Sequence, residues 1–237
     1  QAAVVREDVA RARGHQVAGI HQHLARHTLL AIQGGTFQLG NNDTSGDLSA
    51  ATSITVASGT SLSVNRTDSV TINTPISGAG NLNKNAAGTL TRSSGTDSHT
   101  GSTNLNTGTL ALSGTGSISG TTYFGNPTAN TTTTLTVADT ANLAVNGFMT
   151  LGDQTNAAIT INQTGGTVSN SGTTNNPGGN SMSNRWGHWG GGATVYNISA
   201  GSLSLTGAPL YLSWDGAATL NVSGTGVVNL LGVEQAS

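Results

Sequence analysis

The feature that most constrains the fold is a short pattern that recurs four times between Tyr123 and Leu231. Each copy has an aromatic or aliphatic pair, a glycine-rich turn, a four-residue strand with alternating apolar residues, and a second turn. Intervals of 24, 37 and 24 residues separate the ends of the four strands, which are Val137, Ile161, Ile198 and Val222. The long interval is one 24-residue unit with a 13-residue insertion, placed at 170–184. A fixed period of this size predicts a solenoid, whose units stack because none can bury its apolar face alone.

The short strands have one apolar side and one polar side. In Leu135-Thr136-Val137 and Leu220-Asn221-Val222, successive side chains point to opposite sides, so Leu and Val face inward and Thr and Asn face outward. Such strands wrap into a coil of about three faces, and stacked coils lie ~4.8 Å apart. We therefore predict an all-β fold, a parallel β-helix (β-solenoid) of about eight coils and ~40 Å over residues 34–237.

Composition narrows the classes of function. Only 8% of the 237 residues are charged and 34 are glycine, yet 35% are hydrophobic, which favours many short strands over a disordered chain. The net charge of -2 gives no reason to expect nucleic acid as a partner. No apolar run is long enough to span a membrane. Cysteine is absent, so disulfides and thiolate metal sites are excluded, and we predict no cofactor.

The segment 1–33 differs from the rest of the chain. It holds six of the 18 charged residues and four of the six histidines. The sequence starts at Gln1 without the charged and apolar regions of a signal peptide, so we expect a processed form or a fragment. Apolar residues recur at roughly helical spacing, although Gly14 and Gly19 weaken one continuous helix. Solenoids expose unpaired strand edges at their ends, and a terminal cap commonly covers them. We therefore predict that 1–33 forms a short helical N-terminal cap.

The stretch 78–114 carries a motif of its own. It reads G-x-G-x-L-x-K-x-x-x-G-T-L-T and then T-G-x-T-x-L-x-x-G-T-L-x-L. This motif resembles the autotransporter-associated β-strand repeat of bacterial surface proteins, and the units in 122–232 look like the degenerate repeats that accompany it. The resemblance implies a right-handed parallel β-helix at the bacterial cell surface or outside the cell, and no catalytic residues. Arg92 stands where Leu is usual and His99 near a usual Tyr, which indicates an irregular wall at 92–99.

Two groups of residues have spacing that can support chemistry. His21, His23 and His27 form an H-x-H-x3-H cluster, but no fourth ligand is near in sequence, so we favour an ordinary polar face and predict no metal. Asp153 and Asp215 occupy matching positions after glycine-rich turns, where paired carboxylates would suit a polysaccharide-cleaving enzyme. Aspartate is common in such turns for its own hydrogen bonding, so we predict no catalytic residue.

Aromatic residues gather in the last third of the chain. They either fill a wider coil or contact a sugar or a partner, and they are Trp186, Trp189, Tyr196, Tyr211 and Trp214. Ranked Thr-x-Thr positions on one flat side would suit an ice-binding face. Thr131–Thr134 hint at such ranks, but the other copies of the pattern do not repeat them.

The C-terminal unit ends in an apolar strand with Glu234 as its one charged neighbour. An open coil of this kind offers unpaired backbone groups and exposed aliphatic residues, here Val228, Leu230, Leu231 and Val233. This open coil of one copy can contact residues 1–33 of another copy in a head-to-tail junction. Because a head-to-tail contact does not close into a dimer, repeated junctions build a filament. We therefore expect a non-catalytic extracellular stalk or self-assembling fibre subunit, partnered by itself or by other surface components. A monomeric stalk and a carbohydrate-binding or polysaccharide-cleaving β-helix are the alternatives.

Overall fold

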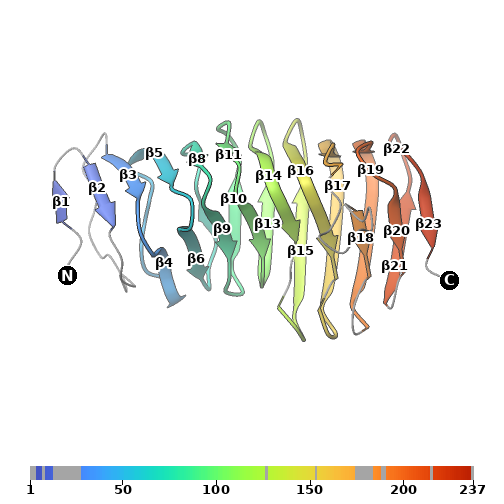
Figure 1. The fold of residues 1–237 in the computed structure, drawn as a ribbon, viewed down its shortest axis with the longest axis horizontal. Helices are drawn as coiled ribbons and strands as arrows, with labels where there is room; N and C mark the ends of the chain where they lie inside the picture. Colours follow the sequence, from blue (N-terminus) through green and yellow to red (C-terminus); the bar gives the residue numbers. More distant parts are fainter. Residues whose placement is uncertain are drawn as a thin grey trace.

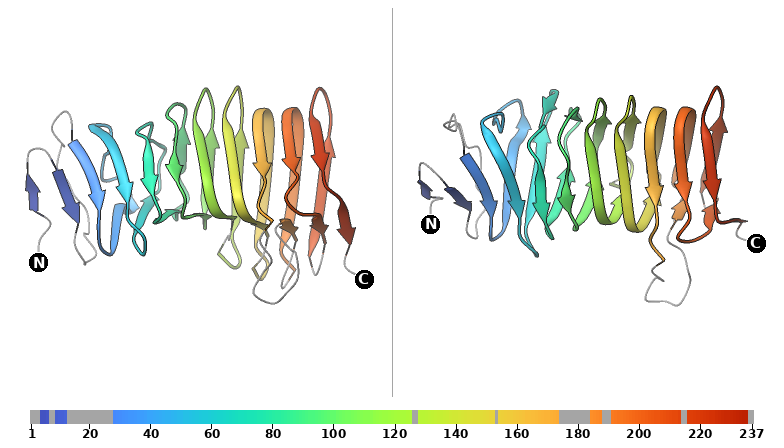
Figure 2. Two further views of the ribbon diagram at one scale, coloured as in Figure 1. Left: turned by 45° about the horizontal axis from the view of Figure 1, so that its top comes forward. Right: turned by 90° about the horizontal axis from the view of Figure 1, so that it is seen from above.

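The computed structural model shows an all-β fold built mostly from parallel strands (Figure 1). It describes residues 4–6, 9–12, 28–125, 128–152, 154–173, 184–187, 191–213 and 216–235, and no helix occurs among them. The strands follow one another along the longest axis, with the two termini at opposite ends (Figures 1 and 2). The predicted all-β, solenoid-like architecture is therefore confirmed.

Parallel pairing arranges the strands in three ladders, because each strand bonds to a strand one coil earlier and one coil later. The first ladder begins with β2 (Val9–Ala12), β3 (Thr28–Ile32), β5 (Ala51–Val56), β8 (Ile76–Gly78) and β11 (Ser98–His99). The paired sheet ends at β11, and the ladder resumes in the other sheet. There it consists of the starts of β14 (Ser117–Gly125) and β16 (Asn142–Leu151), the ends of β17 (Ala158–Asn170) and β19 (Ala193–Leu205), and β22 (Val227–Leu230).

The other two ladders run beside the first. The second consists of β4 (Thr36–Asp43), β6 (Ser61–Arg66), β9 (Asn81–Lys84), β12 (Ser102–Leu105), the ends of β14 and β16, β18 (Asn184–Trp186), β20 (Leu210–Leu212) and β23 (Val233–Gln235). The third consists of β7 (Val70–Thr71), β10 (Thr89–Arg92), β13 (Gly108–Leu112), β15 (Thr132–Val137), the starts of β17 and β19, and β21 (Ala217–Val222).

The core is a set of apolar rows that run along the stack. In the third ladder one row passes from Leu110 to Leu135 and then to Ile161, each 1% exposed or less. Burying one such side chain stabilises the fold by roughly 1.5–3 kcal/mol. Every second residue of a strand contributes to a row, so the polar residues between them face outward.

The predicted N-terminal helical cap is wrong where the structure describes that segment. β1 (Val4–Arg6) pairs antiparallel with β2, and β2 pairs in parallel with β3. Since the edge of β3 offers a row of unpaired backbone groups, adding strands there satisfies more of them than a local helix would. Residues 13–27, with His21, His23 and His27, lie outside the described residues.

The register differs in part from the predicted period. Ile198 pairs with Val222 as expected. The other two expected pairs are wrong, because Val137 pairs with Gln163 rather than with Ile161, and Ile161 pairs with Tyr196 rather than with Ile198. Stacked Asn162 and Asn197 are 35 residues apart, whereas Asn197 and Asn221 are 24 apart. The extra residues lie between β17 and β18, where the insertion was predicted.

No helix in the described ranges is long and apolar enough to cross a membrane.

Candidate functional site

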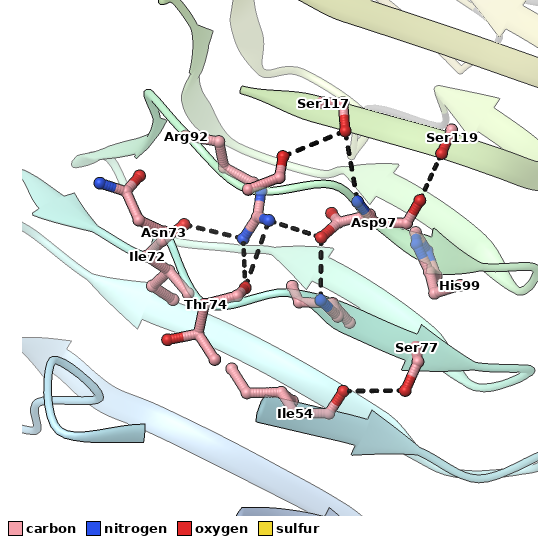
Figure 3. Close-up of polar contacts among 12 residues, drawn as sticks. Ile54, Ile72, Asn73, Thr74, Ser77, Arg92, Asp97, His99, Ser117 and Ser119 are labelled. Carbon is pink, nitrogen blue, oxygen red and sulfur yellow. Dashed lines mark hydrogen bonds and ion pairs between the residues drawn. The ribbon is translucent and has the colours of Figure 1, made fainter. Parts of the chain in front are cut away.

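A charged cluster lies inside the coil where the sequence departs from its repeat, at Arg92, Asp97 and His99 (Figure 3). Arg92 ends β10 and points inward, because it stacks on Leu112 in the core register. A nitrogen of its guanidinium lies 2.5 Å from Oδ1 of Asp97, and both side chains are 0% exposed. The irregular wall expected here is a long turn between β10 and the two-residue strand β11.

The guanidinium also binds the coil below. It donates from Nη1 to the carbonyl oxygen of Ile72 at 2.7 Å and to that of Thr74 at 3.2 Å. A buried cation needs several such acceptors to offset its lost hydration. Burial still lowers the pKa of Arg92 from its ordinary value, against the favourable effect of the Asp97 charge.

Asp97 connects coils on both sides of its own (Figure 3). Its Oδ1 accepts the backbone N–H of Ile76 at 2.9 Å in the preceding coil. Its own N–H donates to Oγ of Ser117 at 3.2 Å, and its carbonyl oxygen accepts the hydroxyl of Ser119, both in the following coil. Burial raises the pKa of the Asp97 carboxyl to about 6, although Arg92 acts in the opposite direction.

His99 completes the cluster as a neutral ring. Its Nε2 lies 3.2 Å from the hydroxyl of Thr103, and the ring is 0% exposed. Burial, with a smaller effect of the nearby Arg92 charge, lowers the pKa of His99 to about 4. An acid, a base and a cation therefore lie close together, but all three side chains are enclosed by the coil. The arrangement suits holding three coils together better than reacting with a ligand.

Sequence reasoning marked Arg92 and His99 as exceptions but did not join them to Asp97. The available signal was the inward position of Arg92 in Thr89-Leu90-Thr91-Arg92, since a buried arginine requires a carboxylate within reach. Lys84 is a second inward cation that was seen only as part of the motif. It is 2% exposed, its Nζ donates to the carbonyl oxygens of Ala86 and Thr107, and burial lowers its pKa to about 8.

Two of the five predicted aromatic contact residues lie in the core. Trp186 and Tyr196 are 0% exposed and stack with ring centroids 5.1 Å apart and planes 11° apart. The hydroxyl of Tyr196 donates to Oε1 of Gln163 at 2.7 Å. These two rings fill the coil, which was one of the two interpretations. Tyr211 is half-buried on the second ladder, and Trp189 and Trp214 lie outside the described residues.

Two buried asparagines close the base of the insertion. Nδ2 of Asn170 donates to Oδ1 of Asn184 at 2.8 Å, and both side chains are 0% exposed. The same Asn170 amide reaches the carbonyl oxygen of Gly147, and Asn184 reaches that of Ala208. These hydrogen bonds join the end of β17 to the start of β18 and tie both to the neighbouring coils.

The predicted assembly residues lie on the last described coil. Val228, Leu230 and Val233 continue the inward rows of Leu203, Leu205 and Leu210. Val233 is 55% exposed and Leu231 62% exposed, whereas the three residues beneath those rows are fully buried. Asp153 and Asp215, the rejected catalytic pair, lie outside the described residues.

Comparisons with known proteins add no further information about the site. No family model matches the chain, and neither the curated proteins nor the solved structures contain a match.

Proposed function

We propose that the chain is a non-catalytic structural segment of a bacterial surface protein, a stalk or a self-assembling fibre subunit. In this proposal the three ladders form a right-handed parallel β-helix of about eight coils, as the resemblance of 78–114 to autotransporter-associated repeats implies. The proposal places the protein outside the cell or on its surface.

The observation that carries this proposal is the uncovered coil of β21, β22 and β23. Each of these three strands pairs, among the described strands, with a strand of the preceding coil and with no strand on its other side. Their inward positions hold aliphatic residues, and Val222 is 53% exposed where its partner Ile198 is 1% exposed. A surface of unpaired backbone groups over a row of aliphatic side chains favours the addition of another coil. That coil comes from a second copy or from further units of the same polypeptide.

Electron microscopy and light scattering of the purified chain test the assembly. We expect filaments or concentration-dependent oligomers from the parent chain, and monomers from Val233→Lys, because a lysine in an inward row blocks stacking. The matched control is Ser204→Lys, which puts the same charge on an outward, half-buried position of β19. Dispersed monomers of the parent chain at high concentration would contradict self-assembly and leave the monomeric stalk.

The non-catalytic part of the proposal has a separate test. Screening against pectic, alginate-like and glycosaminoglycan polymers should give no cleavage. Activity that disappears in Asp153→Ala or Asp215→Ala would contradict the proposal and favour the polysaccharide-cleaving alternative.

One observation favours carbohydrate binding as a second candidate. Arg185 and Tyr211 are stacked partners on the outward side of the second ladder, and both are half-buried. A flat ring beside a guanidinium suits the face and the hydroxyls of a sugar. Binding of soluble polysaccharides that falls in Tyr211→Ala would support this candidate, and equal binding by parent and variant would exclude this surface.

A further inference from the structure

The outward side of the third ladder carries a regular grid of threonines that the sequence alone does not reveal. The first column of the grid joins residues that are direct partners in successive strands, namely Thr89, Thr109, Thr134, Thr160, Val195 and Thr219. The second column lies two residues further along each strand, at Thr71, Thr91, Ala111, Thr136, Asn162, Asn197 and Asn221. The strands that carry both columns follow one another along the long axis (Figure 1).

As the sequence indicated, the later copies do not repeat the Thr-x-Thr pair of 134–136, because they carry asparagine in the second column, at Asn162, Asn197 and Asn221. The threonines come from different local motifs, so the sequence shows one pair at Thr89-Leu90-Thr91 and another at Thr134-Leu135-Thr136. Parallel pairing aligns Thr91 and Thr136 in one column, with the smaller Ala111 between them. It aligns the first residues of the two pairs in the other column, on either side of Thr109.

The geometry of the grid is set by the backbone. Neighbouring strands lie ~4.8 Å apart, and alternate residues of one strand lie ~6.7 Å apart. The β-branched threonine side chain has few χ1 rotamers, which fixes its hydroxyl and methyl groups. Hydrogen bonds fix the asparagines as well, because Asn197 donates to Asn162 at 3.0 Å and Asn221 donates to Asn197 at 2.8 Å. Buried residues such as Leu110 and Leu135 anchor the strands to the core on the inward side.

The chemistry of the grid excludes most other ligands. Among the described residues of the seven third-ladder strands the one charged side chain is Arg92, which is buried and points inward. An anionic polymer would require cations on the face. A sugar polymer would require exposed rings, and the one aromatic residue described in these strands, Tyr196, is 0% exposed. What remains is a neutral, rigid array of hydroxyl, amide and methyl groups.

We propose that this outward face of the third ladder, from β10 to β21, binds ice, the ordered lattice of water. A neutral lattice matches a face without exposed charge, and its oxygens repeat in rows at spacings comparable to those between stacked strands. The threonine hydroxyls and asparagine amides hydrogen-bond to lattice waters, and the methyl groups of Thr, Ala and Val fill the spaces between them. This activity goes beyond the structural function and does not depend on self-assembly.

The first ladder supplies the control. From β14 onward its outward positions are also uncharged, but most are serine or alanine, as in the column of Ala144, Ser169 and Ser204. Thr167 is a half-exposed threonine on that other face. Both Thr160 and Thr167 belong to β17, but Thr160 lies on the third ladder and Thr167 on the first. Thr160→Lys and Thr167→Lys therefore make the same change on the proposed face and on the control face.

The test measures the shape of single ice crystals and the gap between melting and freezing temperatures in solutions of the full chain. We expect the parent chain to shape crystals and open this gap. Thr160→Lys should reduce the gap by about tenfold or more, because a neutral lattice cannot solvate an ammonium group. Thr167→Lys should keep the same temperature gap as the parent chain. If the far-UV circular dichroism spectrum shows that Thr160→Lys does not keep the parental fold, Thr134→Lys replaces it as the test variant.

Three results would overturn the proposal. The first is round, unshaped crystals at every concentration of a folded parent chain. The second is an equal loss of activity in Thr160→Lys and Thr167→Lys. The third is adsorption of the chain to insoluble cellulose or chitin without any effect on ice, lost in Thr160→Lys, which would assign the face to a polysaccharide.

Discussion

Replacing Tyr196 by phenylalanine deletes one buried hydroxyl group and leaves the ring in place. That hydroxyl donates to Oε1 of Gln163 at 2.7 Å, while Nε2 of Gln163 donates to the carbonyl oxygen of Ser202 at 2.9 Å. Gln163 is 1% exposed. The substitution therefore removes the hydroxyl partner of Oε1 in a place where water does not replace it.

The expected cost follows from this geometry. A buried acceptor without its partner costs about 1–3 kcal/mol, whereas the stacking of the ring on Trp186 is retained. We expect the free energy of unfolding to fall by about 2 kcal/mol. At roughly 2–4 °C per kcal/mol for a chain of this length, the melting temperature should fall by about 6 °C.

Thermal unfolding followed by far-UV circular dichroism measures this change, with Tyr211→Phe as the matched control. Tyr211 is half-buried, so water can replace what its hydroxyl contacts, and its loss should change stability by about 0.5 kcal/mol or less. Burial also raises the pKa of Tyr196 above its ordinary value, so one tyrosine of the folded parent should ionise only when the chain unfolds in alkali. Equal melting temperatures for the two variants would refute the reasoning.

Three further predictions concern buried groups and tight turns. Arg92→Leu should lower the free energy of unfolding more at pH 8 than at pH 5, as measured by urea unfolding at each pH. Removing the cation raises the pKa of Asp97 further above about 6, and a carboxyl whose pKa is raised in the folded state loses its contribution to stability as pH rises through that pKa. Adding Asp97→Asn should remove this pH dependence. The parent should gain stability as pH rises from about 8 to 10.5, since the folded state loses the Lys84 proton first, and Lys84→Met should lack this gain in the same assay. Gly192→Ala should lower stability by about 1–3 kcal/mol, because its Cβ would lie 1.8 Å from a backbone oxygen of the preceding coil, whereas Gly232→Ala, with its nearest neighbour at 4.0 Å, should be neutral in thermal melts.

The sequence determined the fold class and the place of the insertion. Alternation in segments such as Leu135-Thr136-Val137 decides which side chains are buried, because successive residues of a strand point to opposite faces. Glycine and asparagine between the strands end them at short intervals, so a stacked, all-β architecture follows from local chemistry. The insertion was found because it interrupts a period, and Asn170 and Asn184 at its base are indeed bonded to each other.

Local patterns could not decide the N-terminal segment or the register. The spacing of apolar residues in 1–33 suits a helix, yet Val9–Ala12 pairs with Leu29–Ile32, because a strand edge offers hydrogen bonds that lie far away in the sequence. In the same way, turn length between coils sets whether Ile161 stacks on Tyr196 or on Ile198, and a turn can gain or lose two residues without changing the pattern on either side.

Only the tertiary structure brought together the charged cluster and the threonine grid. Arg92 and Asp97 are close in sequence, but their partners Ile76, Ser117 and Ser119 come from neighbouring coils. Thr89, Thr109, Thr134 and Thr160 likewise belong to four coils. Sequence dictates which face of a strand each residue occupies, because that depends on the residue's position in its own strand. Which residues become neighbours across coils depends on the lengths of all the turns between them, and only the folded chain fixes those.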